Sequence, residues 1–237
     1  MEAMADTAMD TVMNTCDPAL IRLLQLVSPT LPTGSFSYSQ GLEWAVEAGW
    51  VHDSRSLGDW LGEAMQRAVC MVDIPILRLM YQACHDRSIE QLDRCCDLLL
   101  ACRESHELQE EEKQRGRAMA VLLAGLSQLP DDGWQRVLSR SQLAGFAYAA
   151  RRWDIDLHGA ALGYLWGWLE NQVLAGVKII PLGQTAGQRL LLELGEKIVP
   201  AVAYGMTLQE DEIGSSSPAL ALAGCFHETQ YTRLYRS

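Results

Sequence analysis

The side chains best suited to metal chemistry in this chain are its histidines and one cysteine. The histidines are scattered without the spacing of a ligand set, and only Cys225 and His227 form a near pair. A metal site needs three or four ligands, although residues far apart in sequence can meet in a fold or across a dimer. The sequence therefore predicts no complete metal site and leaves this pair as a candidate. The histidines are His52, His85, His106, His158 and His227.

Two isolated charges lie in stretches that are otherwise apolar. Lys178 lies inside VLAGVKIIPLG, and Glu43 lies inside GLEWAV. An ammonium group among apolar residues must extend to solvent, pair with an acid or face a partner. Spacing alone favours an internal ion pair or an exposed edge, and the other interpretation is a recognition surface.

The carboxyl-terminal residues have the composition of a binding segment. Residues 218–226 are apolar enough to form one helix, and residues 227–237 mix Tyr, Leu and Arg, which is typical of protein interfaces. The alternative is a tail that packs on its own domain. Both interpretations hold if the segment orders fully only with its partner.

No pattern in the chain indicates catalysis. The phosphate-binding pattern GxxxxGK[ST] is absent, so the chain is not itself a nucleotide hydrolase. Ser35, Ser37 and Ser39 lie in no GxSxG elbow, and we expect them to cap helices and to form hydrogen bonds in a loop. The formal net charge of -11 argues against nucleic-acid partners, which need a basic surface.

The cysteine pattern and the ends of the chain indicate a cytosolic protein. Seven cysteines without a CxxC pair are typical of reduced thiols. Residues 1–17 hold four acids and no Lys or Arg, so we expect a disordered acidic tail and no signal peptide. The apolar stretch 173–182 is too short to span a bilayer, so we expect a soluble protein with no membrane partner.

The composition favours helices over sheets. Hydrophobic residues make up 49% and aromatic residues 7%, with few runs of Val, Ile and Thr. We therefore expect an all-α fold, a single compact domain of roughly eight to ten helices, with residues 18–205 as its core and residues 206–237 as a partner-binding segment. Helices are expected at 18–28, about 38–49, 57–68, from 73–75 to 85, 88–102, 134–152, 156–176, from 185 to a bend or end at 200–205, and 218–226.

The stretch 103–117, RESHELQEEEKQRGR, holds Leu108 as its one apolar residue among five glutamates, three arginines and a lysine. Such a run predicts a solvated helix rather than a site. Its carboxylates could bind a metal weakly, but no histidine lies four residues after His106.

Residues 31–43, LPTGSFSYSQGLE, predict a rigid turn that leads into a helix. Pro32 fixes its backbone angle, Gly34 permits a tight turn, and Ser37 with Gln40 has the spacing of a capping box. The pattern PxGxFSxSxGLE, followed by WAVEAGWV, by GVKIIPLGQ at 176–184 and by HETQYTRLYRS at 227–237, resembles the UreF family of urease accessory proteins. The resemblance runs from about Leu20 to Ser237.

This resemblance implies a helical, cytoplasmic and dimeric adaptor without a reaction or a cofactor of its own. Such a protein would join the scaffold accessory protein UreD, also called UreH, to the GTPase UreG, for GTP-dependent delivery of nickel to apo-urease. The alternative is a stand-alone nickel metallochaperone that uses Cys225, His227 and the glutamates near 107–112. Under the adaptor interpretation the partner-binding residues are Tyr38, Glu43, Lys178, His227, Glu228, Gln230, Tyr231, Arg233 and Arg236.

Overall fold

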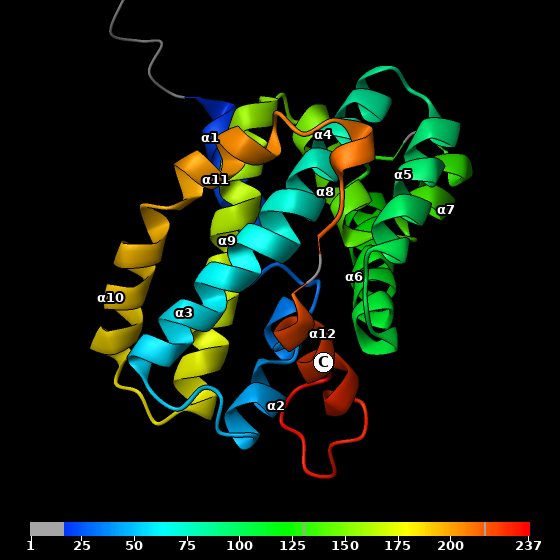
Figure 1. Ribbon diagram of the computed structural model, residues 1–237. Coiled ribbons are helices and arrows are strands. Elements are labelled where there is room, and N and C mark those ends of the chain that lie inside the picture. The colour runs from blue at the N-terminus through cyan, green and yellow to red at the C-terminus, as the bar shows by residue number, and fades with distance from the viewer. Residues whose placement is uncertain (1–16, 130, 216) are drawn as a thin grey trace, which may run out of the picture.

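The chain folds into α-helices packed around one long helix (Figure 1). A computed structural model describes residues 17–129, 131–215 and 217–237. These residues contain no β-strand, so the all-α prediction is confirmed, and the number of helices is close to the expected one. The α-helices are α1 Pro18–Val27, α2 Leu42–Glu47, α3 Ser54–Ala64, α4 Ile74–His85, α5 Ile89–Ala101, α6 His106–Gly125, α7 Asp132–Leu138, α8 Gln142–Arg152, α9 Leu157–Ile179, α10 Gln184–Gly195, α11 Ile198–Gly205 and α12 Pro218–His227.

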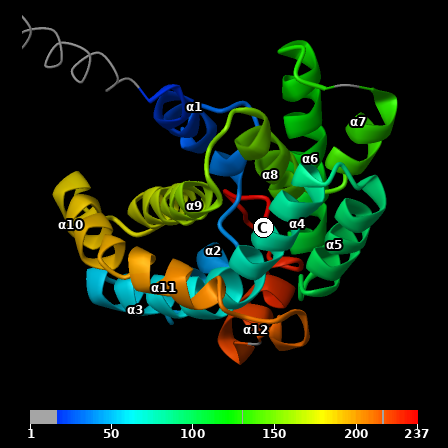
Figure 2. The same ribbon diagram turned by 90° about the horizontal axis from the view of Figure 1, so that it is seen from above.

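The central element is α9, which contacts α1, α2, α3, α4, α8, α10 and α11. Figure 2 shows α9 nearly end-on, with α1, α2, α3 and α10 on several sides of it. Small residues allow this close packing. A β-carbon on Gly163 of α9 would lie 2.6 Å from Leu23 of α1, and one on Gly145 of α8 would lie 2.5 Å from Met119 of α6. These two glycines therefore permit the close approach of their helices.

Helix starts follow the capping residues of the sequence at most positions. The side chain of Asp53 caps α3 together with Ser56, and Ser88 caps α5 by accepting from the backbone N–H of Gln91. The predicted helix 134–152 is wrong, because it divides into α7 and α8 where Ser141 caps α8. Helix α10 begins at Gln184, close to the expected position 185, without a side-chain cap.

The helix predicted from 73–75 to 85 is confirmed as α4, which begins at Ile74 with Pro75 in its first turn. The π-helical segment Met65–Asp73 joins α3 to α4 without a break. Pro75 has no N–H to donate to the carbonyl four residues earlier. Gly214 donates to that carbonyl, of Met71, at 3.2 Å, so a later segment supplies the missing hydrogen bond.

A buried network of charges crosses the core. Arg103 donates to Asp73 at 2.8 Å and to Glu112 at 3.0 Å. Asp73 also accepts from the hydroxyl of Tyr164 at 2.8 Å, and Glu112 accepts from Ser141 at 2.8 Å. The prediction of a solvated helix at 103–117 is therefore wrong at its centre. Charged residues can be buried when tertiary partners satisfy them, and these partners lie on distant segments.

The network changes the acidity of its two carboxyl groups in opposite directions. Burial raises the pKa of Asp73, and Arg103 opposes this increase. Burial also favours a higher pKa for Glu112. Arg103, Arg115 and the hydrogen-bond donors from α8 outweigh this effect, so the pKa of Glu112 lies below its usual value. Glu112 therefore stays ionised while it receives hydrogen bonds from the start of α8.

Two further expectations concern the ends of the chain and the membrane. The expected acidic tail, residues 1–17, lies outside the described residues except for Asp17, which caps α1 by accepting from Ala19 at 2.9 Å. Within the described parts of the chain, no helix combines the length and the apolar character needed to cross a bilayer.

Replacing Arg103 by Met should strongly destabilise the fold. The substitution leaves the carboxylates of Asp73 and Glu112 buried without their shared cation, which costs on the order of 3 to 5 kcal/mol. Urea denaturation measures the loss. Arg94→Met is the control, because Arg94 is exposed. Equal stability of the two variants would contradict the role given to the network.

Candidate partner-binding site

The loop before α2 has a backbone that few residues other than glycine adopt. Gly34, Gln40 and Gly41 all have positive φ, at 75°, 54° and 82°. The capping box expected for Ser37 and Gln40 is wrong, because α2 begins only at Leu42. Ser39 instead provides a side-chain acceptor at the start of α2, because its hydroxyl accepts from the backbone N–H of Glu43 at 3.2 Å.

Gly41 also allows α2 and α12 to meet. A β-carbon at this position would lie 2.9 Å from the backbone nitrogen of Gly224 in α12. A side chain here would therefore meet both an unfavourable backbone angle and a backbone collision. The glycine of the GLE motif thus sets the distance between the loop and the carboxyl-terminal segment, residues 227–237.

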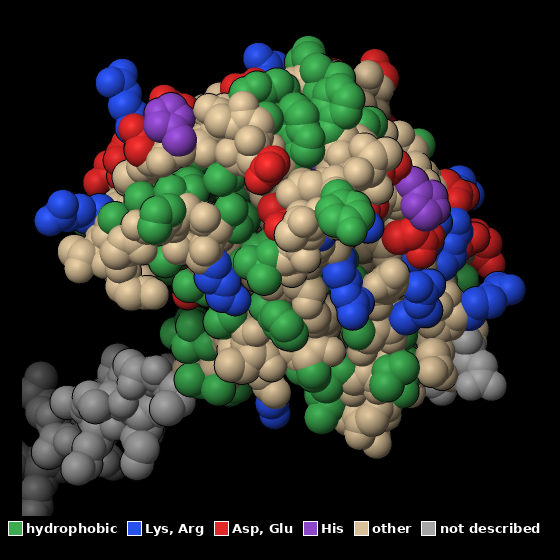
Figure 3. Space-filling view, turned by 90° about the horizontal axis from the view of Figure 1, so that it is seen from below, with side chains coloured by type: hydrophobic (Ala, Val, Ile, Leu, Met, Phe, Trp, Pro, Cys, Tyr) green, Lys and Arg blue, Asp and Glu red, His purple; other side chains and the backbone are tan. Residues whose placement is uncertain are grey.

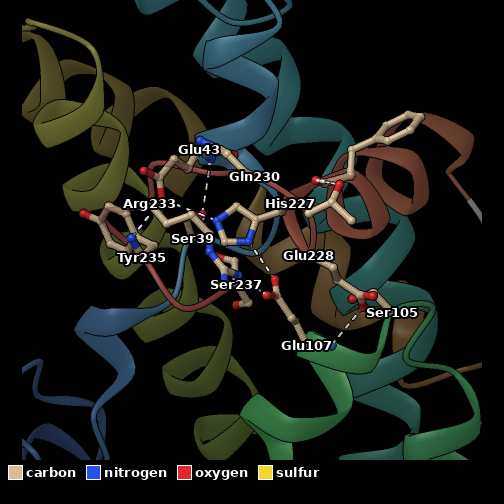
Figure 4. A network of polar contacts seen from close by, with 12 residues as sticks. Ser39, Glu43, Ser105, Glu107, His227, Glu228, Gln230, Arg233, Tyr235 and Ser237 are labelled. Atoms are coloured by element: carbon tan, nitrogen blue, oxygen red, sulfur yellow. Dashed lines mark hydrogen bonds and ion pairs between the residues drawn. The ribbon is translucent and has the colours of Figure 1, made fainter.

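Glu43 holds the carboxyl-terminal segment from inside. Its side chain is 8% exposed, and its two oxygens accept from the backbone N–H groups of Leu234 at 2.6 Å and Tyr235 at 2.8 Å. Nε2 of His227 lies 3.4 Å from the same carboxylate. A buried carboxylate needs such donors, because losing its water contacts without replacement is costly. Figure 4 shows these groups pointing toward one another.

The end of the segment also pairs with the loop through the backbone. The carbonyl of Ser237 accepts from the N–H groups of Ser39 at 2.7 Å and Gln40 at 3.0 Å. It accepts from the hydroxyl of Ser39 at 2.6 Å as well. Arg236 donates its N–H to the carbonyl of Ser37 at 2.8 Å. Residues 37–43 therefore form a cradle for residues 234–237.

One face of α6 forms the other side of this cradle. Glu107 contacts His227 and Arg233, and Glu111 accepts from the hydroxyl of Ser237 at 3.0 Å. Gln114 accepts from the hydroxyl of Tyr38 at 3.0 Å. Residues spaced by four and three share one face of a helix, so positions 107, 111 and 114 line up along the segment.

His227 lies between two carboxylates with no exposed surface. Its Nδ1 is 2.6 Å from Glu107, and its Nε2 faces Glu43. Each ring nitrogen thus faces one carboxylate. The ring therefore joins α2, α6 and α12 at one point.

The opposite side of the segment faces solvent. The exposed fraction is 102% for Tyr231, 69% for Leu234 and 47% for Phe226. The ring of Phe226 stacks on Trp44, with ring centres 4.9 Å apart. Figure 3, which views the molecule from below, shows hydrophobic side chains interspersed with Lys and Arg on this side. Exposed aromatic and Arg side chains are typical of binding surfaces.

The structure gathers most of the predicted partner-binding residues around the segment. Glu43 and His227 are buried, Tyr38 is buried with its hydroxyl on Gln114, and Glu228 accepts from the N–H of Glu107 at 3.2 Å. Gln230 is half-buried, whereas Tyr231, Arg233 and Arg236 are exposed.

Lys178 lies apart from this group. It is exposed in the last turn of α9 and forms no ion pair with another described residue. In Figure 1 this end of α9 and α2 lie toward the same end of the molecule. Because Lys178 is exposed and forms no ion pair with another described residue, it is not the partner of the buried Glu43.

Sequence reasoning missed the residues that receive the segment. These are Ser39 and Gln40 in the loop, Glu107, Glu111 and Gln114 on α6, and the buried Tyr235 and Ser237 in the segment itself. The spacing of 107, 111 and 114 on one helix face was the available signal. The high local charge of this stretch indicated a solvated helix, and the partners of Glu107 and Glu111 in the segment lie more than 100 positions away.

The candidate metal ligands near the segment make contacts of other kinds. His227 and Glu107 meet, but Cys225 is exposed. Within residues 17–129, 131–215 and 217–237, no three side chains of His, Cys, Asp or Glu are grouped as a metal site.

Replacing Glu43 by Gln should release the segment. The amide keeps the size of the side chain but accepts weakly from the N–H groups of Leu234 and Tyr235, because charged acceptors form stronger hydrogen bonds. We expect hydrogen exchange at both amides to become about tenfold faster or more, with the core unchanged. Glu47→Gln is the matched control, since Glu47 is exposed on the same helix. Unchanged exchange at both amides would refute this role.

Known proteins resemble this chain along most of its length. A family model described as UreF matches residues 51–195. Urease accessory protein UreF of Alcanivorax borkumensis is 45% identical over 225 residues, covering 92% of this chain and 98% of that protein. UreF of Pseudomonas putida W619 is 49% identical, covering 93% and 99%, and UreF of a Marinomonas species is 42% identical, covering 97% and 100%. The chain therefore belongs to the UreF family of urease accessory proteins.

Proposed function

We propose that this chain is an adaptor without a reaction of its own in the maturation of urease. It joins the scaffold accessory protein, UreD or UreH, to the GTPase UreG, and the assembly delivers nickel to apo-urease in a GTP-dependent manner. The adaptor positions the two partners relative to each other. Its contribution is binding free energy, and the hydrolysis of GTP belongs to the GTPase.

The observation that carries this proposal is the division of the carboxyl-terminal segment into two sides. The inner side is tied to Glu43, Glu107 and Glu111. The outer side presents Tyr231 and Leu234, which have few contacts with their own chain. Apolar and aromatic side chains exposed together on one side of a segment mark an interaction surface. We assign the outer side to direct partner contact, and Glu43 and His227 to positioning it.

Lys178 supplies a second contact in this proposal. Its ammonium group is exposed on the last turn of α9 and is free of internal acids among the described residues. An exposed cation on a chain with a net charge of -11 can determine how an acidic partner orients. We assign Lys178 to partner recognition, separate from the carboxyl-terminal segment.

The remaining parts of the proposal concern assembly and location. We propose a homodimer, supported by exposed apolar side chains on α10 and α11, where Leu192 is 74% and Val199 is 57% exposed. We propose a cytoplasmic location, supported by free buried thiols, since burial raises the pKa of Cys84 to about 12 and keeps it unreactive. In this scheme residues 18–205 form the core and residues 206–237 the partner-binding part.

Removing the outer apolar contacts should weaken scaffold binding without affecting the fold. In the double variant Tyr231→Ser and Leu234→Ser, both side chains are exposed, so thermal stability should stay within about 0.5 kcal/mol. Affinity for the scaffold protein should fall about tenfold or more, because aromatic anchors dominate interface energies. The equally apolar change Ile21→Ser with Leu24→Ser on α1 is the control. If both double variants bind equally well, the outer side is not the contact.

The alternative is a stand-alone nickel metallochaperone, and the 2.6 Å contact between His227 and Glu107 favours it. Both groups are already engaged, by Glu43 and Arg233. Equilibrium dialysis of the isolated protein with nickel separates the two functions. We expect no stoichiometric site with a Kd below about 1 µM, which corresponds to roughly 8 kcal/mol. Such a site, abolished by His227→Gln, would support the metallochaperone instead.

A further inference from the structure

A groove lies at the end of α6 that is farther from the carboxyl-terminal segment. It has a volume of about 680 Å³ and is lined by the ends of α4 and α8, the chain after α6 and part of α7. That volume falls within the range of small-molecule sites. Because α6 has 20 residues, this groove is about 30 Å from Glu107. Figure 2 shows α6 extending from the side of α12 toward α7.

The lining of the groove concentrates positive charge in an acidic protein. Arg87, Arg151, Arg152 and His85 all contribute to it. Arg151 is engaged, because it donates to His85 at 3.2 Å and to Asp154 at 3.3 Å. The guanidinium groups of Arg87 and Arg152 form no hydrogen bond or ion pair with another residue of the described chain.

The two free guanidinium groups line the groove together with the ring of Tyr148. Burial raises the pKa of Tyr148, and Arg152 and Arg87 both oppose this increase. Tyr148 packs on Trp134, with ring centres 5.1 Å apart. Both arginines and this aromatic pair therefore line the same groove.

The backbone around the groove has unfavourable angles. Only four described residues other than glycine have positive φ, and three of them, Arg87, Ser127 and Asp154, line this groove at φ 55°. Each follows the end of a helix, where glycine is favoured. Residues in such conformations are concentrated at ligand sites. An arginine at position 87 therefore lowers the free energy of unfolding relative to glycine, and the fold itself does not require an arginine there.

The arginines are not needed to satisfy the helix ends. After α4 the N–H of Ser88 donates to the carbonyl of Ala83 at 2.9 Å, and after α8 the N–H of Ile155 donates to Ala150 at 2.9 Å. The acids of the lining are also engaged. Asp131 accepts from the N–H of Trp134 at 3.1 Å, and Asp154 accepts from Arg151.

The unused groups in the groove are donors. Trp134 is 7% exposed, and its indole N–H, which can only donate, forms no hydrogen bond with the residues described. Arg87 and Arg152 offer planar groups that match phosphate oxygens in pairs. A ligand that satisfies these groups must be rich in acceptors and negatively charged.

We propose that this groove binds a small phosphorylated molecule, with Arg87 and Arg152 on the phosphate and the Trp134–Tyr148 pair beneath the rest of the ligand. The proposal is independent of the partner contacts described above, because it uses none of their residues. The competing explanation is that the cations only complement the negative ends of α4 and α8.

Calorimetric titration with pyrophosphate, at constant ionic strength set by chloride, tests this site in the full-length chain. We expect saturable binding with a Kd below about 1 mM. The double variant Arg87→Gly and Arg152→Gln should weaken binding about tenfold or more, whereas Arg94→Gln with Arg189→Gln, the same charge change at exposed positions, should not. Equal loss in both double variants, or no saturation with the unaltered chain, would overturn the proposal.

Two further measurements separate a ligand site from a structural role. Arg87→Gly alone should leave the melting temperature equal or higher, because glycine suits the left-handed backbone, while pyrophosphate binding falls. A lower melting temperature would show that Arg87 serves the fold, and would overturn the proposal. Citrate provides a carboxylate probe of similar charge. Binding of citrate without binding of pyrophosphate would refute the assignment to phosphate.

Discussion

The carboxylate of Glu43 is the constraint on which the arrangement of the partner-binding end depends. It is buried, and no lysine or arginine of the described chain forms an ion pair with it, so its charge must be met by hydrogen-bond donors. Those donors are the backbone N–H groups of Leu234 and Tyr235, and Nε2 of His227 lies 3.4 Å from the same carboxylate. The backbone of the carboxyl-terminal segment is thus part of the solvation of an acid in α2. Segment and acid stabilise each other.

Helix α6 connects this constraint to the rest of the fold through two faces. Its inward face carries Glu112, which accepts hydrogen bonds from Arg103 and from the first turn of α8. The neighbouring face carries Glu107 and Glu111, which contact His227 and Ser237 of the carboxyl-terminal segment. Because consecutive glutamates at 111 and 112 point in different directions on a helix, one helix fixes the core and the binding segment together. This explains why so charged a helix is also so well buried.

The sequence predicted the parts of the structure that local rules determine. The helix at 218–226 and the all-α class follow from short-range patterns. It failed at 103–117, because charge indicates exposure only when no distant partner satisfies it. Glu43 was recognised as unusual, but whether it faced a partner or its own chain depended on residues about 190 positions away. No local rule determines such a contact.

The central claim is that a buried acid controls a surface it does not touch. Affinity for the scaffold accessory protein, measured by calorimetric titration for the unaltered chain, Glu43→Gln and Glu47→Gln, tests it most directly. Our account predicts that Glu43→Gln binds about tenfold more weakly or worse, although residue 43 is shielded from the partner, and that Glu47→Gln binds normally. Full affinity of Glu43→Gln, with its segment released, would contradict the account.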